Sequence, residues 1–99
     1  MYKLDYHDLV SEDYNEAYIR YEFIQDGLGE RFAAAVRKRS GQISEHPEHY
    51  GEKARKGYRE VKVEGFPYLI VYRIYKRKKT VFISSIHHEK KHPRKKYRK

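Results

Sequence analysis

The 99-residue sequence contains no cysteine and no long apolar run. Without cysteine the chain can form neither a disulfide framework nor a cysteine-based zinc site. No segment approaches the roughly 20 apolar residues that a membrane-spanning helix needs, and residues 1–10 lack the apolar core of a signal peptide. The composition therefore predicts a cytoplasmic protein that does not enter a membrane. A chain of this length is expected to form one domain with one modest core.

Negative charge is scarce in the second half of the chain, although it dominates the beginning. Residues 1–30 contain eight Asp and Glu against two Lys and Arg, whereas residues 65–99 contain one against twelve. The whole chain has a net charge of +9. Such a basic half would attract a polyanion or an acidic protein partner. The alternative is that a lysine-rich surface only keeps a small domain soluble.

The most apolar stretch, residues 65–88, is predicted to form a β-hairpin that carries much of the core. Residues 66–75 are rich in β-branched and aromatic side chains, which suit strands. Residues 76–79 are four consecutive cations, which only a solvent-exposed turn would accept. Alternation along the second strand, residues 80–86, predicts one face with Val81, Ile83 and Ser85 and another with Phe82, Ser84 and Ile86.

The remaining segments predict a helix pair and two further strands. Residues 2–6 alternate weakly and are typical of a first strand, and Asp8 is suited to cap the following helix. Gly27 fits a left-handed helix end, and a second helix is expected from about residue 28 to residue 45, where Pro47 stops it. Residues 46–57 are predicted to form a surface loop and residues 58–64 a strand. The apolar stripe expected on the first helix consists of Val10, Tyr14, Ala17, Tyr21 and Ile24.

The predicted order is therefore β-α-α-β-β-β, an α+β fold in two layers. Short links predict an αα-hairpin packed on one face of an antiparallel sheet. The other face is expected to stay bare and open to a partner. Residues 1–88 would form the domain, and residues 89–99 a basic, solvated tail. Removal of residues 88–99 is expected to leave the fold intact.

Several short pieces of the sequence, taken in order, are similar to one known family. They are Asp13-Tyr-Asn-Glu-Ala17, Tyr21-Glu22, Gly27-Leu-Gly-Glu-Arg-Phe32, Ile43-Ser-Glu-His-Pro47, Tyr58-Arg59, Phe66-Pro-Tyr-Leu-Ile-Val-Tyr-Arg73 and Ile86-His-His-Glu-Lys-Lys-His-Pro93. They cover nearly the whole chain and resemble the RelE/ParE superfamily of bacterial type II toxins, more like its ParE or plasmid-stabilisation branch. The resemblance implies a toxin without a cofactor. A cognate antitoxin would neutralise it through a C-terminal segment that wraps it, in a homodimer or a heterotetramer.

The superfamily divides by target. RelE-like members cut messenger RNA on the ribosome without a metal, which needs a base, an acid and cations around the phosphate. ParE-like members bind DNA gyrase and need no catalytic group. Leu69 stands where the family nucleases carry an arginine early in the third strand. The resemblance therefore favours the ParE-like toxin, while the endoribonuclease and a non-toxic relative that only binds nucleic acid or protein stay open. Residues that could serve a nuclease are His88, Lys90, Lys91, Arg94 and Tyr97.

Candidate residues for binding the target or the antitoxin lie in the predicted strands and their turn. A strand arginine could bind a phosphate or a carboxylate through its paired N–H groups, or could be structural and bridge to Glu60 or Glu64. An acidic antitoxin would also neutralise the cations of the turn. The full set is Arg59, Tyr68, Tyr72, Arg73, Lys76, Arg77, Lys78 and Lys79.

His88 and His92 have the spacing at which a helix would bring two metal ligands together. However, Pro93 follows at once, no carboxylate motif accompanies them and the surroundings are cationic. We therefore expect no metal site.

Overall fold

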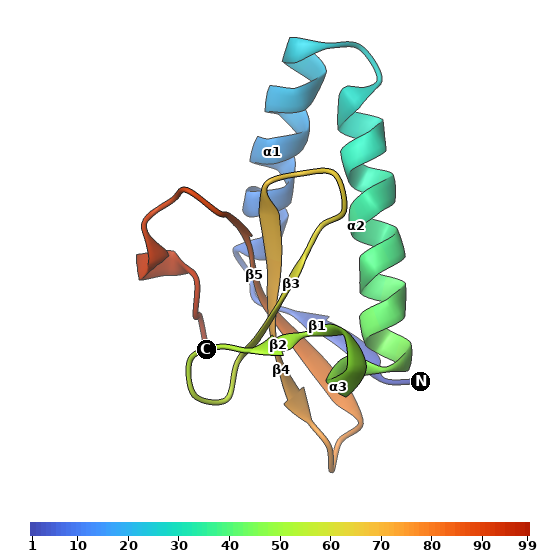
Figure 1. Ribbon diagram of the computed structural model, residues 1–99, viewed down its shortest axis with the longest axis vertical. Coiled ribbons are helices and arrows are strands. Elements are labelled where there is room, and N and C mark those ends of the chain that lie inside the picture. The colour runs from blue at the N-terminus through green and yellow to red at the C-terminus, as the bar shows by residue number, and fades with distance from the viewer.

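The computed structural model describes residues 1–99 and contains three α-helices, five strands and one 3-10 helix (Figure 1). None of the helices combines the length and the apolar character needed to cross a lipid bilayer. In chain order the elements are β1 (Lys3–Tyr6), α1 (Val10–Ile24), α2 (Leu28–Glu45), α3 (Pro47–Tyr50), β2 (Glu52–Lys53), β3 (Arg59–Lys62), β4 (Tyr68–Tyr75), β5 (Thr80–His88) and the 3-10 helix η1 (Pro93–Lys95).

The five strands form one sheet in the order β1-β5-β4-β3-β2, and the α1–α2 hairpin packs on one of its faces (Figure 1). The α+β class and the two-layer arrangement are confirmed. The sheet is mixed rather than purely antiparallel, because β1 pairs parallel with β5, with Leu4 opposite Val81. Parallel pairing needs a long connection, and here the helices and three strands separate the two partners. The expected loop also contains α3 and the short edge strand β2.

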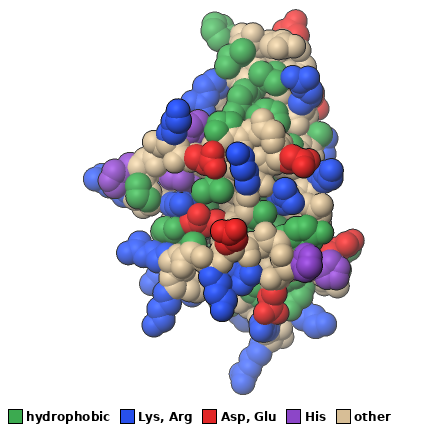
Figure 2. All heavy atoms as spheres, in the orientation of Figure 1, with side chains coloured by type: hydrophobic (Ala, Val, Ile, Leu, Met, Phe, Trp, Pro, Cys, Tyr) green, Lys and Arg blue, Asp and Glu red, His purple; other side chains and the backbone are tan.

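The helical hairpin turns at Gly27, whose φ of 87° lies in the left-handed region. The first helix begins at Val10 without the expected cap from Asp8; instead the Leu9 N–H donates to His7 Nδ1 at 3.1 Å. Ile24 was expected in the buried stripe but is 64 % exposed, together with its neighbour Phe23. In Figure 2 the hydrophobic side chains at the upper end of the molecule lie over this turn.

The core lies between the helices and the sheet. Phe32 of α2 is its centre, with the rings of Tyr21, Phe66 and Tyr68 at centroid distances of 5.2 to 5.4 Å. Full burial of such a side chain contributes on the order of 2–3 kcal/mol to folding. The buried members of the core are Val10, Ala17, Phe32, Val36, Ile43, Val61, Val63, Tyr68, Ile70, Tyr72, Val81, Ile83 and Ile86.

A β-bulge in β5 changes the predicted faces of the last strand. Tyr72 lies opposite Ile83 and Val71 lies opposite Ser85, so Ser84 is an extra residue on the β5 side. The extra residue shifts the alternation by one position. Ile86 therefore joins Val81 and Ile83 in the core, and the prediction that it faces the other way is wrong. The bulge also leaves two hydroxyls, those of Ser84 and Ser85, next to each other at buried positions.

The second face of the sheet is not bare, contrary to the prediction. The end of the chain loops out after β5 and returns to the sheet near β2 and β3 (Figure 1). Residues 96–98 lie on this face, where Ser84 and Ser85 bond to their backbone. Val71, which is not part of the core on the helix side, is fully buried. The expected solvated tail is therefore partly docked: residues 89–95 and Lys99 are exposed, whereas Lys96, Tyr97 and Arg98 are half-buried.

Candidate functional site

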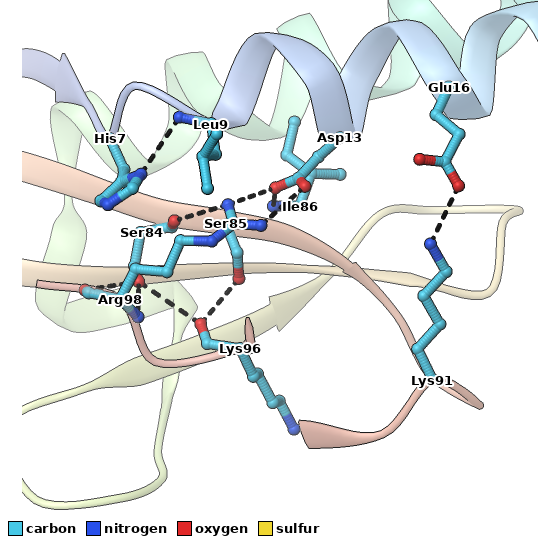
Figure 3. A network of polar contacts seen from close by, with 10 residues as sticks. All are labelled: His7, Leu9, Asp13, Glu16, Ser84, Ser85, Ile86, Lys91, Lys96 and Arg98. Carbon is cyan, nitrogen blue, oxygen red and sulfur yellow. Dashed lines mark hydrogen bonds and ion pairs between the residues drawn. The ribbon is translucent and has the colours of Figure 1, made fainter. Parts of the chain in front are cut away.

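Two adjacent serines of β5 anchor the C-terminal segment, residues 89–99, to the sheet (Figure 3). The Ser84 hydroxyl accepts from the Arg98 N–H at 2.6 Å and lies 2.7 Å from the Arg98 carbonyl oxygen. The Ser85 hydroxyl donates to the Lys96 carbonyl at 2.7 Å. Both serines are almost fully buried, so their polar atoms need such partners. The face of a sheet offers no free backbone N–H or C=O groups to a segment that lies on it. The hydroxyls of Ser84 and Ser85 provide hydrogen-bond partners for the backbone of residues 96–98 instead.

Asp13 on α1 fixes the end of the segment. Its two carboxylate oxygens accept from Nη1 and Nη2 of Arg98 at 2.7 and 2.9 Å. The same carboxylate accepts the Ile86 N–H at 3.1 Å, just beyond the bulge. The side chains of Asp13 and Arg98 are only 16 % and 12 % exposed. Paired contacts of this kind are the strongest ion pairs that arginine forms. The first helix, the last strand and the chain end are thus held at one point.

A pocket of about 490 Å³ opens between α1 and the C-terminal segment. Its acidic side chains are already neutralised: Asp13 by Arg98, and Glu16 by Lys91, whose Nζ lies 3.0 Å from a Glu16 oxygen (Figure 3). Arg94 is exposed and forms no ion pair. The pocket is therefore polar and positive. Its lining residues are Asp13, Glu16, Tyr68, Ile86, His87, His88, Lys91, His92, Arg94, Lys95 and Arg98.

The structure separates the residues that could serve a nuclease. His88, Lys91 and Arg94 line this basic pocket. Lys90 does not line it and is exposed. Tyr97 lies on the other side of the C-terminal segment, where its hydroxyl donates to Glu60. No single cavity therefore contains the whole predicted set.

The protonation states of two candidates follow from their surroundings. Burial lowers the pKa of His88, and the nearby charges of Arg20 and Lys91 act in the same direction. His88 is thus neutral at pH 7. Burial raises the pKa of the Tyr97 phenol, and the hydrogen bond to Glu60 raises it further. Tyr97 therefore retains its proton at neutral pH and keeps it directed to Glu60.

Two of the tyrosines expected at a binding surface belong to the core. Tyr72 is fully buried, and its hydroxyl donates to the Pro47 carbonyl at 2.6 Å. Tyr68 is 3 % exposed and lines the basic pocket. The prediction placed Tyr68 and Tyr72 at a binding surface because the alternation of β4 separates two faces but does not show which of them the helices cover. Tyr68 lines the basic pocket beside His88, whose ring packs edge-on against the Tyr68 ring at a centroid distance of 5.0 Å.

The two strand arginines have different surroundings. The Arg59 side chain is held by backbone carbonyls: its Nη2 donates to the Glu48 carbonyl at 2.9 Å and also to that of Gly51. These partners differ from the glutamates expected from the sequence. The Arg73 guanidinium lies over the Tyr58 ring, 4.9 Å from its centroid, on the same side as the C-terminal segment. Arg73 is half-exposed and stays a candidate for binding.

The four cations of the β4–β5 turn, Lys76, Arg77, Lys78 and Lys79, are all exposed. Lys76 forms an ion pair with Glu48 at 3.2 Å, and the other three form none. The basic side chains project from the lower end of the molecule in Figure 2, where this turn lies. The turn is free to meet an acidic partner.

An apolar groove of about 910 Å³ runs between β1, α1 and α2. Leu4, Val10 and Val36 contribute apolar walls, and Gly41 leaves one side open because nothing lies within 4 Å of where its Cβ would stand. The sequence analysis did not predict this groove, since it depends on how far the helices stand from β1.

No group of three or more His, Cys, Asp or Glu side chains is placed to hold a metal ion. Sequence reasoning also missed Asp13 and Arg98 as partners and gave no role to Ser84 and Ser85. The one signal available was a pair of adjacent serines inside an otherwise apolar strand, which marks a local change in the faces of that strand.

Residues 4–93 match the family described as "ParE toxin of type II toxin-antitoxin system, parDE". The chain belongs to the ParE toxin family. No curated protein matches the sequence. Three solved structures share the fold of this ParE-family chain. The chromosomal ParDE toxin–antitoxin system from P. aeruginosa is 19 % identical with a TM-score of 0.66, covering 89 % of this chain and 96 % of its own.

The other two structures are RelE proteins of E. coli. The intact RelBE toxin–antitoxin complex is 18 % identical with a TM-score of 0.66, covering 92 % of this chain and 100 % of its own. The isolated RelE toxin is 17 % identical with a TM-score of 0.63, covering 93 % of this chain and 88 % of its own. At these identities the likeness shows a common fold. The predicted RelE/ParE membership is confirmed, and this chain is a ParE-family toxin of a toxin–antitoxin system.

Proposed function

We propose that this ParE-family toxin acts in the cytoplasm, where it inhibits growth by binding DNA gyrase, and that a cognate antitoxin neutralises it. The main support for a toxin that binds its target without catalysis is that the C-terminal segment separates the candidate nuclease residues. His88, Lys91 and Arg94 are on one side, and Tyr97, bonded to Glu60, is on the other. A general acid must reach the leaving group in the same site as the base. Leu69 adds to this, because it offers no charge to the phosphate.

A second candidate function is metal-independent cleavage of messenger RNA on the ribosome. It is favoured by the convergence of His88, Lys91 and Arg94 on one pocket. A neutral imidazole can accept a proton, and an arginine can stabilise charge on a phosphate. This reading requires the pocket to work without Tyr97.

The antitoxin would occupy the apolar groove between β1, α1 and α2. The groove carries Leu4, Val10, Tyr14, Val36 and Ile70 along its length, which suits the apolar face of an amphipathic helix. An acidic stretch of the same antitoxin would meet the cations of the β4–β5 turn. Two similar structures are toxin–antitoxin systems, ParDE and RelBE, which supports such a partner. The toxin would form a homodimer, or a heterotetramer together with the antitoxin.

The test is induced expression in a host, followed by a gyrase supercoiling assay with the purified chain and by mapping of cellular RNA ends. Trapped cleaved DNA with intact RNA is the expected result. Frame-spaced cuts in messenger RNA with normal gyrase activity would select the nuclease instead. A host that grows normally would contradict both and leave a relative that only binds nucleic acid or protein.

A further inference from the structure

The basic pocket between α1 and the C-terminal segment contains more positively charged side chains than its acidic side chains neutralise. Lys91 and Arg98 are paired with Glu16 and Asp13. Arg94 and Lys95 form no ion pair and are exposed at the mouth of the pocket. Two positive charges therefore stay uncompensated in one small region. A ligand that carries two negative charges would balance them.

Two histidine side chains of the pocket can donate hydrogen bonds to a ligand while their rings are neutral. The Nδ1 atoms of His88 and His92 accept the N–H groups of Lys90 and Arg94 at 3.0 and 3.1 Å. In a neutral imidazole one nitrogen accepts and the other carries the proton. Both rings therefore hold their proton on Nε2, where it can be donated to an oxygen of a ligand.

The position of the chain makes this a pocket rather than an open surface. The C-terminal segment leaves the sheet after His88 and is fixed to it again at Lys96 and Arg98 (Figure 1). It thus forms one wall, and α1 with Asp13 and Glu16 forms the other. Its volume of about 490 Å³ lies in the range of roughly 300–1,000 Å³ found for sites that hold small ligands. Only Tyr68 and Ile86 are apolar among the lining residues, so a polar group fits it best.

We propose that this pocket binds the phosphomonoester of a nucleotide, either free or at the end of a nucleic-acid strand. A phosphomonoester carries close to two negative charges at pH 7 and has three strong acceptor oxygens. Arg94 and Lys95 supply the charge, and His88 and His92 supply N–H donors. An internal phosphodiester carries one negative charge and would leave one cation unbalanced. The proposal does not depend on whether gyrase is the target of the toxin.

The experiment uses the full chain and fluorescence anisotropy with one labelled single-stranded oligonucleotide, prepared with a 5′-phosphate and with a 5′-hydroxyl. The 5′-phosphate form is expected to bind about tenfold more tightly, as one charge-assisted contact would give. A double substitution, Arg94→Gln with Lys95→Gln, is expected to remove this difference. The matched control, Arg77→Gln with Lys78→Gln, removes the same charge at the β4–β5 turn and should retain it.

Competition with a nucleoside monophosphate separates the two sources. Displacement of the oligonucleotide by the free nucleotide would assign the pocket to small nucleotides, and failure to displace it would assign the pocket to strand ends. Equal affinity for the two oligonucleotides would overturn the proposal. The proposal would also be overturned if both double variants lost the preference for the 5′-phosphate oligonucleotide to the same extent. That result would mean non-specific attraction by net charge. None of these binding measurements depends on toxicity, so they test the pocket independently of the proposed gyrase target.

Discussion

Asp13 and Arg98 are 85 residues apart in the chain, and their side chains form a two-point ion pair at 2.7 and 2.9 Å. The contact joins α1 to the last residues of the protein. Because Asp13 also accepts the Ile86 N–H, one carboxylate supports the chain end and the strand beyond the bulge. Asp13 and Arg98 both line the basic pocket, so the pair joins its two walls.

Replacement of Asp13 with alanine is expected to lower the free energy of unfolding by about 1–3 kcal/mol, since it leaves a half-buried guanidinium and a backbone N–H without their acceptor. Urea unfolding of Asp13→Ala, Arg98→Ala and the double variant would measure the coupling between the two residues. The matched control is Glu16→Ala, whose partner Lys91 is more than half exposed; this change should cost less than about 1 kcal/mol. Additive effects of Asp13→Ala and Arg98→Ala would show that the pair is not coupled.

Deletion of residues 96–99 is expected to destabilise the fold, in contrast to the expectation from the sequence. The deletion exposes Val71 and removes the backbone partners of Ser84 and Ser85. Loss of several buried hydrogen bonds should cost a few kcal/mol, on the order of 1 kcal/mol each. Thermal unfolding checks this, with a chain that lacks only the exposed Lys99 as the control. An unchanged melting temperature for the longer deletion would mean that the segment is not docked in solution.

Tyr72→Phe is expected to lower stability by about 1 kcal/mol, because the buried Pro47 carbonyl loses its donor. It should leave the proposed binding of gyrase and antitoxin unchanged, since the ring is inaccessible. Tyr75→Phe removes a hydroxyl from a side chain that is 41 % exposed and serves as the control. If Tyr72→Phe altered partner binding without altering stability, our placement of Tyr72 in the core would be wrong.

Stability is expected to fall as the pH drops below neutrality, and His87 is one cause. Burial lowers the pKa of His87, with Lys96 adding to the effect, while its bond to the Lys91 carbonyl opposes it. The folded protein therefore binds fewer protons than the unfolded chain below the ordinary pKa of about 6.5. The stabilisation is complete above that value and is lost as the pH falls through the folded pKa.

Urea midpoints at pH values of about 7.5 and 5.5 would measure this loss, since those values lie on either side of the ordinary histidine pKa. His87→Gln, which cannot titrate, should show a smaller decrease between the two values than the unchanged chain. His88 shifts in the same direction, so part of the decrease should persist. An identical decrease in His87→Gln would exclude His87 as a contributor.

Gly41→Leu is expected to weaken antitoxin binding, because the new side chain enters open space beside the apolar groove. The fold should not suffer, since glycine in a helix interior costs about 1 kcal/mol relative to alanine. Gly41→Ala is the control and should stabilise α2 while binding the antitoxin nearly as well. Calorimetric titration with the purified antitoxin gives both affinities. Full affinity for Gly41→Leu would place the antitoxin elsewhere.

The apolar patterns of the sequence predicted the two long helices and the β4–β5 hairpin correctly, because these depend on neighbours within a few residues. The family was predicted from the resemblance of several short pieces in order, and it is confirmed. Gly27 turned the chain where expected, and residues 76–79 formed the exposed turn. The errors have a common origin. Ile86, Tyr68 and Tyr72 were placed on the wrong side because a single extra residue, Ser84, and the choice of the helix-covered face cannot be read from alternation.

The sequence by itself determined the basic second half, the order of the two long helices and the main strands, and the absence of cysteine chemistry, since each follows from local composition and periodicity. Only the tertiary structure decided that the last residues fold back onto the sheet. The partners that hold them, Asp13, Ser84 and Ser85, are individually ordinary polar residues. Their significance comes from a bulge and a long-range ion pair, which bring distant segments together in space.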